Sequence, residues 1–208
     1  MTTGTGSYVW RFDSGRVCLD LLATGEPVAG RQERIDGAVP LGQWLVGAGL
    51  VPEGTPLTAV DARWVRAFAE LRGRLGELVR AELRAELRAE RDGRPSRDAT
   101  AALARVNALA AGAPPALRAV RRADGTLVRA LDAEPECAAL LAVVARDAVE
   151  LLTDPAARAR LRQCEGDSCR RVYLDTSRGR RRRWCSSEVC GNRERVARHR
   201  RRAALARA

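Results

Sequence analysis

The clearest pattern of hydrophobic and polar positions in the 208-residue chain lies between residues 60 and 87. Apolar side chains recur there mostly at steps of three and four, which places them on one face of an α-helix. They are Val60, Trp64, Phe68, Leu71, Leu75, Leu78, Leu83 and Leu87. Thr58 or Asp61 can cap the start of this helix, and the Gly and Pro at 92–95 predict its end.

Two further helices and a hairpin follow from the same reasoning. Residues 98–110 have a buried side at Leu103, Val106 and Leu109, and the stretch from Glu136 to Leu152 has a broad apolar face that favours a central position. Between them, two apolar segments within 117–131 flank Asp124-Gly125, a dipeptide typical of tight turns. This stretch predicts a β-hairpin.

The first residues predict a short strand and a buried element. Residues 8–12 alternate aromatic and β-branched side chains, which favours a strand. The run from Val17 to Leu22 is apolar except for Asp20. Asp20 is a candidate catalytic acid, but an acid that binds backbone groups at a turn or a helix end is the favoured interpretation.

The last fifty residues predict a small module of mixed structure. We expect a short helix from Pro155 to about Gln163, a strand at 172–174, a turn at 177–179 and a return segment at 180–183. A final helix spans about 188–206, with Ser186 or Ser187 as its cap. The expected fold is mainly α with a small β component, divided into domains at 1–155 and 156–208.

Four of the six cysteines form two pairs with equal internal spacing, Cys164/Cys169 and Cys185/Cys190. Four thiolates suit a tetrahedral Zn²⁺ ion, and because four protein ligands leave no open position, we expect one structural zinc. Free thiols or two disulfides are the alternatives. His199, the sole histidine, is a possible zinc ligand, but a role as a surface or phosphate-contacting residue is favoured. Cys18 and Cys137 are expected to be packed thiols.

Charge is concentrated in the same module. All 37 basic residues are arginines, and residues 161–208 hold 15 of them against 5 acids, whereas residues 1–160 are nearly neutral. Such asymmetry suggests a polyanionic partner, and nucleic acid is favoured, with DNA ahead of RNA. The candidate contacts are Arg178, Arg180, Arg181, Arg182, Arg183, Arg193, Arg195, Arg198, His199, Arg200, Arg201 and Arg202.

Several alternatives remain open at this point. Tyr173 and Trp184 can stack on unpaired bases, although a role in the module's miniature core is favoured. The module can also dock an acidic protein. An enzyme is not expected, because the metal site is closed and the chain shows no phosphate loop or nucleophile motif. We expect a cytoplasmic location, since neither a secretory signal nor an apolar run of membrane-spanning length is present.

The C-terminal segment resembles the CGNR zinc-finger family. The resemblance rests on the four cysteines, the Asp175-Thr-Ser-Arg178 run, Trp184 and the sequence Cys190-Gly-Asn-Arg193. Gly179 departs from the family, which usually has Asn there. The resemblance implies a metal-binding module that contacts nucleic acid in bacterial regulators.

The N-terminal segment resembles the ABATE domain that precedes such fingers. Leu19-Asp-Leu-Leu-Ala-Thr24 is similar to a family stretch that ends in Asn-Thr, with Ala23 in place of Asn. Residues 41–45 with Gly49-Leu50 are similar to the short helix and turn of the family. The resemblance implies a transcription regulator whose N-terminal domain senses a small molecule or forms a homodimer.

Overall fold

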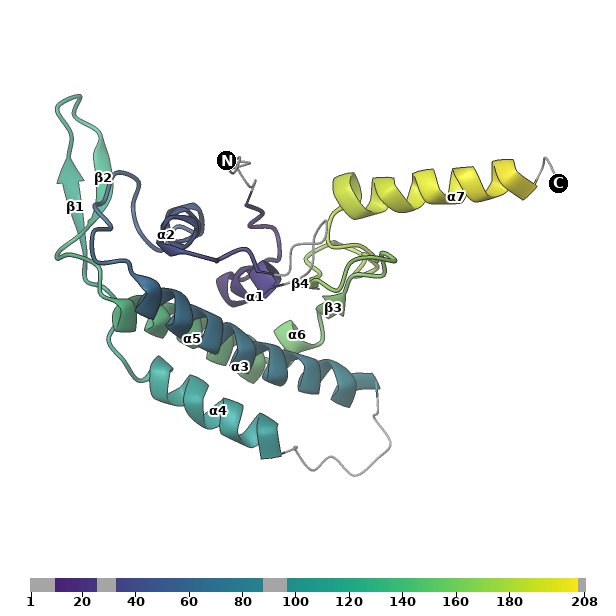
Figure 1. The fold of residues 1–208 in the computed structure, drawn as a ribbon, viewed down its shortest axis with the longest axis horizontal. Coiled ribbons are helices and arrows are strands. Elements are labelled where there is room, and N and C mark those ends of the chain that lie inside the picture. The colour runs from purple at the N-terminus through teal and green to yellow at the C-terminus, as the bar shows by residue number, and fades with distance from the viewer. Residues whose placement is uncertain (1–9, 26–32, 88–96, 206–208) are drawn as a thin grey trace, which may run out of the picture.

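The computed structural model describes residues 10–25, 33–87 and 97–205 (Figure 1). Helices dominate, and two separate antiparallel sheets of two strands each complete the described part. This confirms the predicted fold class. The predicted strand residues 8 and 9 and the predicted helix end at 92–95 lie outside the described residues.

The two N-terminal helices are short; the first is buried along most of its length, whereas the second buries one face only. Helix α1 (Val17–Leu22) is followed by a 3₁₀ turn (Ala23–Gly25) and then by α2 (Ala38–Gly47). The prediction of a strand at 8–12 is wrong for residues 10–12, which belong to no strand. Their surroundings explain the difference, because no neighbouring strand pairs with them and Phe12 instead packs against Trp44 of α2, at 6.5 Å between ring centroids.

Three long helices form the body of the molecule. Helix α3 (Ala62–Leu87) lies beside α4 (Arg97–Ala110) and α5 (Cys137–Thr153). As predicted, α5 is central, because one face of it is buried along its whole length from Leu140 to Leu151. Asp61 caps α3 by accepting hydrogen bonds from two backbone N–H groups at the first turn.

The predicted hairpin is present. Strand β1 (Leu117–Arg121) pairs with β2 (Leu127–Leu131), with Val120 opposite Val128. Gly125 supplies the positive φ of 85° that the turn needs. The hairpin projects from the body at the end opposite the C-terminal helix (Figure 1).

The C-terminal module differs from its prediction in two respects. The helix expected from Pro155 to Gln163 is only one turn long, α6 (Pro155–Arg158), and is followed by strand β3 (Leu161–Gln163). The predicted strand β4 (Val172–Leu174) is present, but it pairs with β3 and not with residues 180–183.

The alternation of side chains along β3 and β4 explains why this pairing forms. Leu161 and Val172 point into the main core of the body, whereas Tyr173, on the other face, is fully buried among the cysteines. The small sheet therefore buries apolar side chains on both faces. It joins the C-terminal module to the body across the predicted boundary at 155/156.

The chain ends in a turn and a long helix. A π-helical turn (Ser187–Gly191) leads directly into α7 (Asn192–Leu205), which extends away from the body (Figure 1). Ser186 caps the turn, and its hydroxyl accepts a hydrogen bond from the N–H of Val189. None of the helices in the described ranges is long and apolar enough to cross a lipid bilayer.

Candidate metal centre

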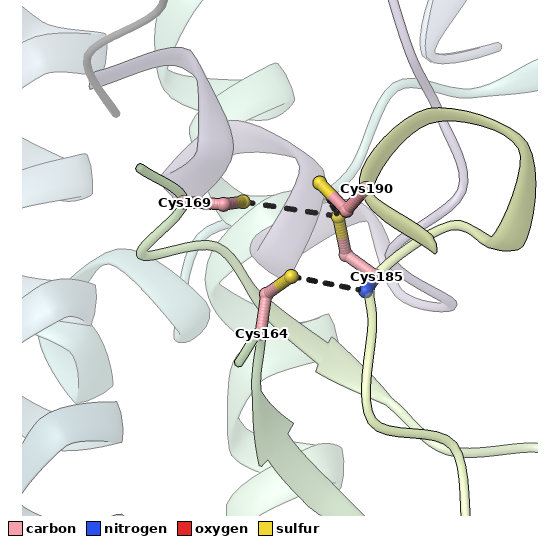
Figure 2. Close-up of side chains that lie close together, drawn as sticks. All are labelled: Cys164, Cys169, Cys185 and Cys190. Atoms are coloured by element: carbon pink, nitrogen blue, oxygen red, sulfur yellow. Dashed lines mark hydrogen bonds between the residues drawn. The ribbon is translucent and has the colours of Figure 1, made fainter. Parts of the chain in front are cut away.

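The four predicted cysteines come together at the junction of the C-terminal module and the body. Their sulfur atoms all lie within 4.8 Å of one another, and Figure 2 shows the four side chains turned toward a common point. Cys164, Cys185 and Cys190 are buried and Cys169 is half-buried. His199 is exposed on α7 and does not belong to this cluster.

Each cysteine is positioned by a short structural element. Cys164 follows β3, and its N–H donates to the carbonyl of Arg171, which closes the knuckle between β3 and β4. Within that knuckle the N–H of Cys169 donates to the carbonyl of Gly166. Cys190 lies in the π-helical turn, a wider turn than an α-helix makes, and π turns often occur at functional sites.

The sulfur positions fit a tetrahedral zinc site. With Zn–S bonds of about 2.3 Å, the edge of the tetrahedron is about 3.8 Å. The separation of the sulfurs is 3.9 Å for Cys169 and Cys185, and 3.6 Å for Cys185 and Cys190. The chemistry of the donors also fits, because thiolates are the soft ligands that zinc prefers in closed structural sites. The cluster therefore suits one structural zinc ion.

Hydrogen bonds and burial set the protonation of the cysteines. Hydrogen bonds from Cys169 and Cys185 lower the pKa of Cys164 below its ordinary value. Burial is the main reason that the pKa of Cys190 is raised to about 11. The backbone N–H of Cys185 donates to the sulfur of Cys164 at 3.3 Å, a contact that orients a thiolate and disperses its charge.

A cation from the start of the chain lies next to the cluster. The guanidinium of Arg11 is 3.9 Å from the sulfur of Cys185. Four thiolates around one divalent cation carry a net charge of about −2, so a neighbouring guanidinium is electrostatically favourable. Sequence reasoning gave Arg11 no role, because 174 positions separate it from Cys185 and no local pattern links them.

Arg171 joins the knuckle to the first described residues. Its guanidinium is buried and donates to the carboxylate of Asp13 at 2.7 Å and to the backbone carbonyl of Arg11 at 2.8 Å. The N–H of Leu174 donates to the carbonyl of Ser14 in the same region. We call this set of contacts the Arg171 clamp; it holds residues 11–14 between the body and the metal centre.

Asp20 binds a backbone group at a turn, which is the interpretation that the sequence favoured over a catalytic role. It is buried, its carboxylate accepts a hydrogen bond from the N–H of Ser14 at 3.0 Å, and it lies 3.8 Å from the guanidinium of Arg171. Burial raises the pKa of Asp20 above its ordinary value. Asp20 therefore supports the turn before α1 and, through Arg171, the Arg171 clamp.

The buried carboxylate of Asp175 organises the segment between β4 and Cys185. It accepts hydrogen bonds from the N–H and hydroxyl of Ser177 and from the N–H of Arg182. Although burial alone would raise it, these hydrogen bonds hold the pKa of Asp175 below its ordinary value. They fix a turn in which Arg180 has a φ of 49°, a conformation rare outside glycine.

The two aromatic residues of the module serve its core. Tyr173 is fully buried and donates from its hydroxyl to the carbonyl of Arg182, and Trp184 packs against the same cluster. The guanidinium of Arg182 lies 4.4 Å from the centre of the Tyr173 ring and donates to two nearby carbonyls. These contacts agree with the miniature-core interpretation for Tyr173, and they occupy Arg182 within the module.

The remaining predicted contact residues divide into two groups. Arg183, Arg193, Arg195 and Arg201 have partners inside the module, for example Glu165 for Arg183 and Ser168 for Arg193. A second group of arginines is exposed and, within the part of the chain that the structure describes, forms no side-chain hydrogen bond or ion pair; His199 is exposed beside them on α7. We call this second group the free arginines: Arg178, Arg180, Arg181, Arg198, Arg200 and Arg202.

Comparison with protein families finds one match in the N-terminal part of the chain and another in the C-terminal part. The model of a family described as "ABATE: Putative stress-induced transcription regulator" matches residues 15–155. The model of the CGNR zinc finger matches residues 160–203, which contain all four clustered cysteines. None of the curated proteins compared with the chain matches it.

Proposed function

The chain belongs to the ABATE family and ends in a CGNR zinc finger, and from this premise we propose that it regulates transcription by binding DNA through the finger and α7. The observation that carries the proposal is the set of free arginines, three of which, Arg198, Arg200 and Arg202, lie on a helix that extends away from the body (Figure 1). Exposed guanidinium groups that form no ion pair in the described structure are available to phosphates, and each neutralised phosphate releases counterions.

The shape of α7 favours DNA over RNA. Its 14 residues span about 21 Å, and an exposed helix of this kind fits the major groove of B-DNA, which is about 12 Å wide. The major groove of A-form RNA is too narrow to admit a helix. The zinc site supports this role by fixing the π-helical turn from which α7 begins.

The N-terminal body would supply the regulatory part of such a protein. We propose that it senses a small molecule or forms a homodimer, while the finger contacts DNA. In this arrangement the Arg171 clamp transmits changes in the body to the metal centre, because residues 11–14 contact both. The proposal assigns no enzymatic reaction to the chain.

The test is fluorescence anisotropy with the full, zinc-loaded chain and labelled duplex DNA between about 50 and 200 mM salt. We expect binding that weakens steeply with salt. The double substitution Arg198→Ala/Arg202→Ala should reduce the slope of log K against log salt by about two. Cys190→Ser, which removes a zinc ligand, should weaken binding as well.

The matched control removes two positive charges elsewhere. Arg66 and Arg84 are exposed on α3, and Arg66→Ala/Arg84→Ala should leave both affinity and salt slope unchanged. Absence of DNA binding at low salt, or an equal loss in the control, would reject the proposal. Preferential binding of RNA of the same length would replace DNA by RNA as the target.

A further inference from the structure

Two apolar features of the body have no cover in the described structure. One is the projecting β1–β2 hairpin, residues 117–131, which we call the arm. The other is a groove of about 580 Å³ beside α2, lined by Ala38, Val39, Gly42, Gln43, Val46, Gly47, Leu57 and Val60. One is convex and the other concave, and both belong to the same body.

The arm exposes large apolar side chains along its length. Leu117 and Leu127 are each 60% exposed, and the register places them on the same face of the hairpin. Val120 is also exposed. An isolated two-stranded hairpin is only marginally stable in water, so a projecting hairpin with exposed leucines gains from a covering surface.

The groove offers a surface of matching polarity. Seven of its eight lining residues carry no polar side-chain group, Gln43 being the exception. Val39, on its rim, is 71% exposed although it lies on a helix whose other face is buried against the body. Covering this groove removes apolar surface from water, which is favourable by about 25 cal/mol for each Å² buried.

The arm and the groove also carry opposite net charge. The arm has four arginines and one aspartate, a net charge of +3, whereas residues 35–61 around the groove have three acids and no arginine, a net charge of −3. None of these charged side chains takes part in an ion pair within residues 10–25, 33–87 and 97–205. Arg118, Arg121 and Arg129 each donate a hydrogen bond to a backbone carbonyl, but no acid of the described residues neutralises their charge, so the two features still carry opposite net charge.

We propose that two copies of this chain form a homodimer in which the arm of each copy docks in the groove of the other. Within one chain, Arg129 at the base of the arm donates a hydrogen bond to the carbonyl of Gly49, but no residue of the arm lines the groove, so the groove is open to the arm of a second chain. A two-fold axis makes both contacts at once, and self-complementary surfaces of this kind are the commonest route to homo-oligomers. The matching shapes and opposite charges on one chain favour a second copy over an unrelated protein.

This inference rests on the proposed function only in choosing dimerisation as the role of the body. Nucleic acid is absent from the test, so failure of dimerisation and failure of DNA binding are separate results.

The experiment is sedimentation equilibrium of the full, zinc-loaded chain. We expect a monomer–dimer equilibrium that weakens with added salt, since opposite charges contribute to it. Leu127→Asp in the arm and Val39→Asp in the groove should each weaken dimerisation at least tenfold, roughly the effect of leaving one large apolar side chain unburied. Both positions are exposed, so circular dichroism should show unchanged helix content.

A matched control and a mixing experiment make the test specific. The prediction that Leu103 is buried is wrong, because it is 47% exposed on α4, and Leu103→Asp should leave the equilibrium unchanged. A mixture of the Leu127→Asp and Val39→Asp chains should form heterodimers in preference to either homodimer, because one intact arm then meets one intact groove. A monomeric wild-type chain, insensitivity to Val39→Asp, or no gain on mixing would overturn the proposal.

Discussion

At the scale of single residues, the clustered cysteines bind protons as well as metal. In the absence of a cation, the pKa of Cys190 is raised to about 11 because the thiol is buried, so this group is protonated at neutral pH. Zinc must displace that proton, and the competition from protons grows as the pH falls. Zinc affinity should therefore rise with pH, by about tenfold per unit for each proton displaced.

The measurement is competition with a chromophoric chelator at several pH values around neutrality. The affinity of the chelator itself is determined at each pH as a control. An affinity for zinc that is independent of pH would mean that the cysteines are already ionised before the metal binds.

Arg171 offers a second test at this scale. Its buried guanidinium binds Asp13 and lies near buried Asp20, so Arg171→Met leaves a buried carboxylate without its cation. Breaking a buried pair costs about 3–5 kcal/mol, and because Asp13 is partly exposed we expect a loss of about 2 kcal/mol in the free energy of unfolding.

Urea unfolding of the zinc-loaded chain measures this loss. The neighbouring Arg170 is exposed, and Arg170→Met provides a matched control that should change stability little. Equal stability of the two variants would show that the Arg171 clamp contributes nothing measurable.

At the scale of elements, the turn that carries Cys190 depends on its cap. Ser186→Ala removes the acceptor for the N–H of Val189 and should cost about 1 kcal/mol, with a corresponding drop in zinc affinity. Ser187, one position later, is exposed, and its side chain has no such hydrogen bond in the described structure. Metal competition should show weaker zinc binding for Ser186→Ala than for Ser187→Ala.

The elements also show what the sequence reveals and what it does not. The periodic apolar positions of α3 and α5 and the Asp124-Gly125 turn are local patterns, and all three elements form as predicted. Strand β3 was missed, because residues 156–160 contain only Ala and Arg, which favour helix, and three residues carry little periodicity. Its pairing with β4 and the burial of Leu161 decide its structure, and both are tertiary effects.

The metal centre, too, can be predicted from the sequence only in part. Four cysteines at matched spacing are visible in the sequence, and the structure brings their sulfurs together. The groups around them are not visible, since Arg11 and Asp13 reach the centre from more than 150 positions away. Local spacing specifies a set of ligands, whereas the contacts that surround the ligands depend on the whole fold.

At the scale of the whole molecule, zinc should stabilise the body as well as the finger. Leu161 and Val172 belong to the main core, and residues 11–14 contact both parts. Removal of zinc by a strong chelator should therefore lower the temperature of one common unfolding transition, without producing a separate transition for the finger. Differential scanning calorimetry with and without chelator measures this, with re-added zinc as the control.

The Arg171 clamp also orders events during synthesis. Asp13 and Arg171 are 158 positions apart, so residues 11–14 lack their contacts with Arg171 and Leu174 until that later segment has emerged from the ribosome. The helices between them can assemble while translation continues. The Arg171 clamp and the full set of four cysteines are present only after Cys190 has been made, and a product that terminates before Arg171 lacks the contacts that hold residues 11–14 against the later segment.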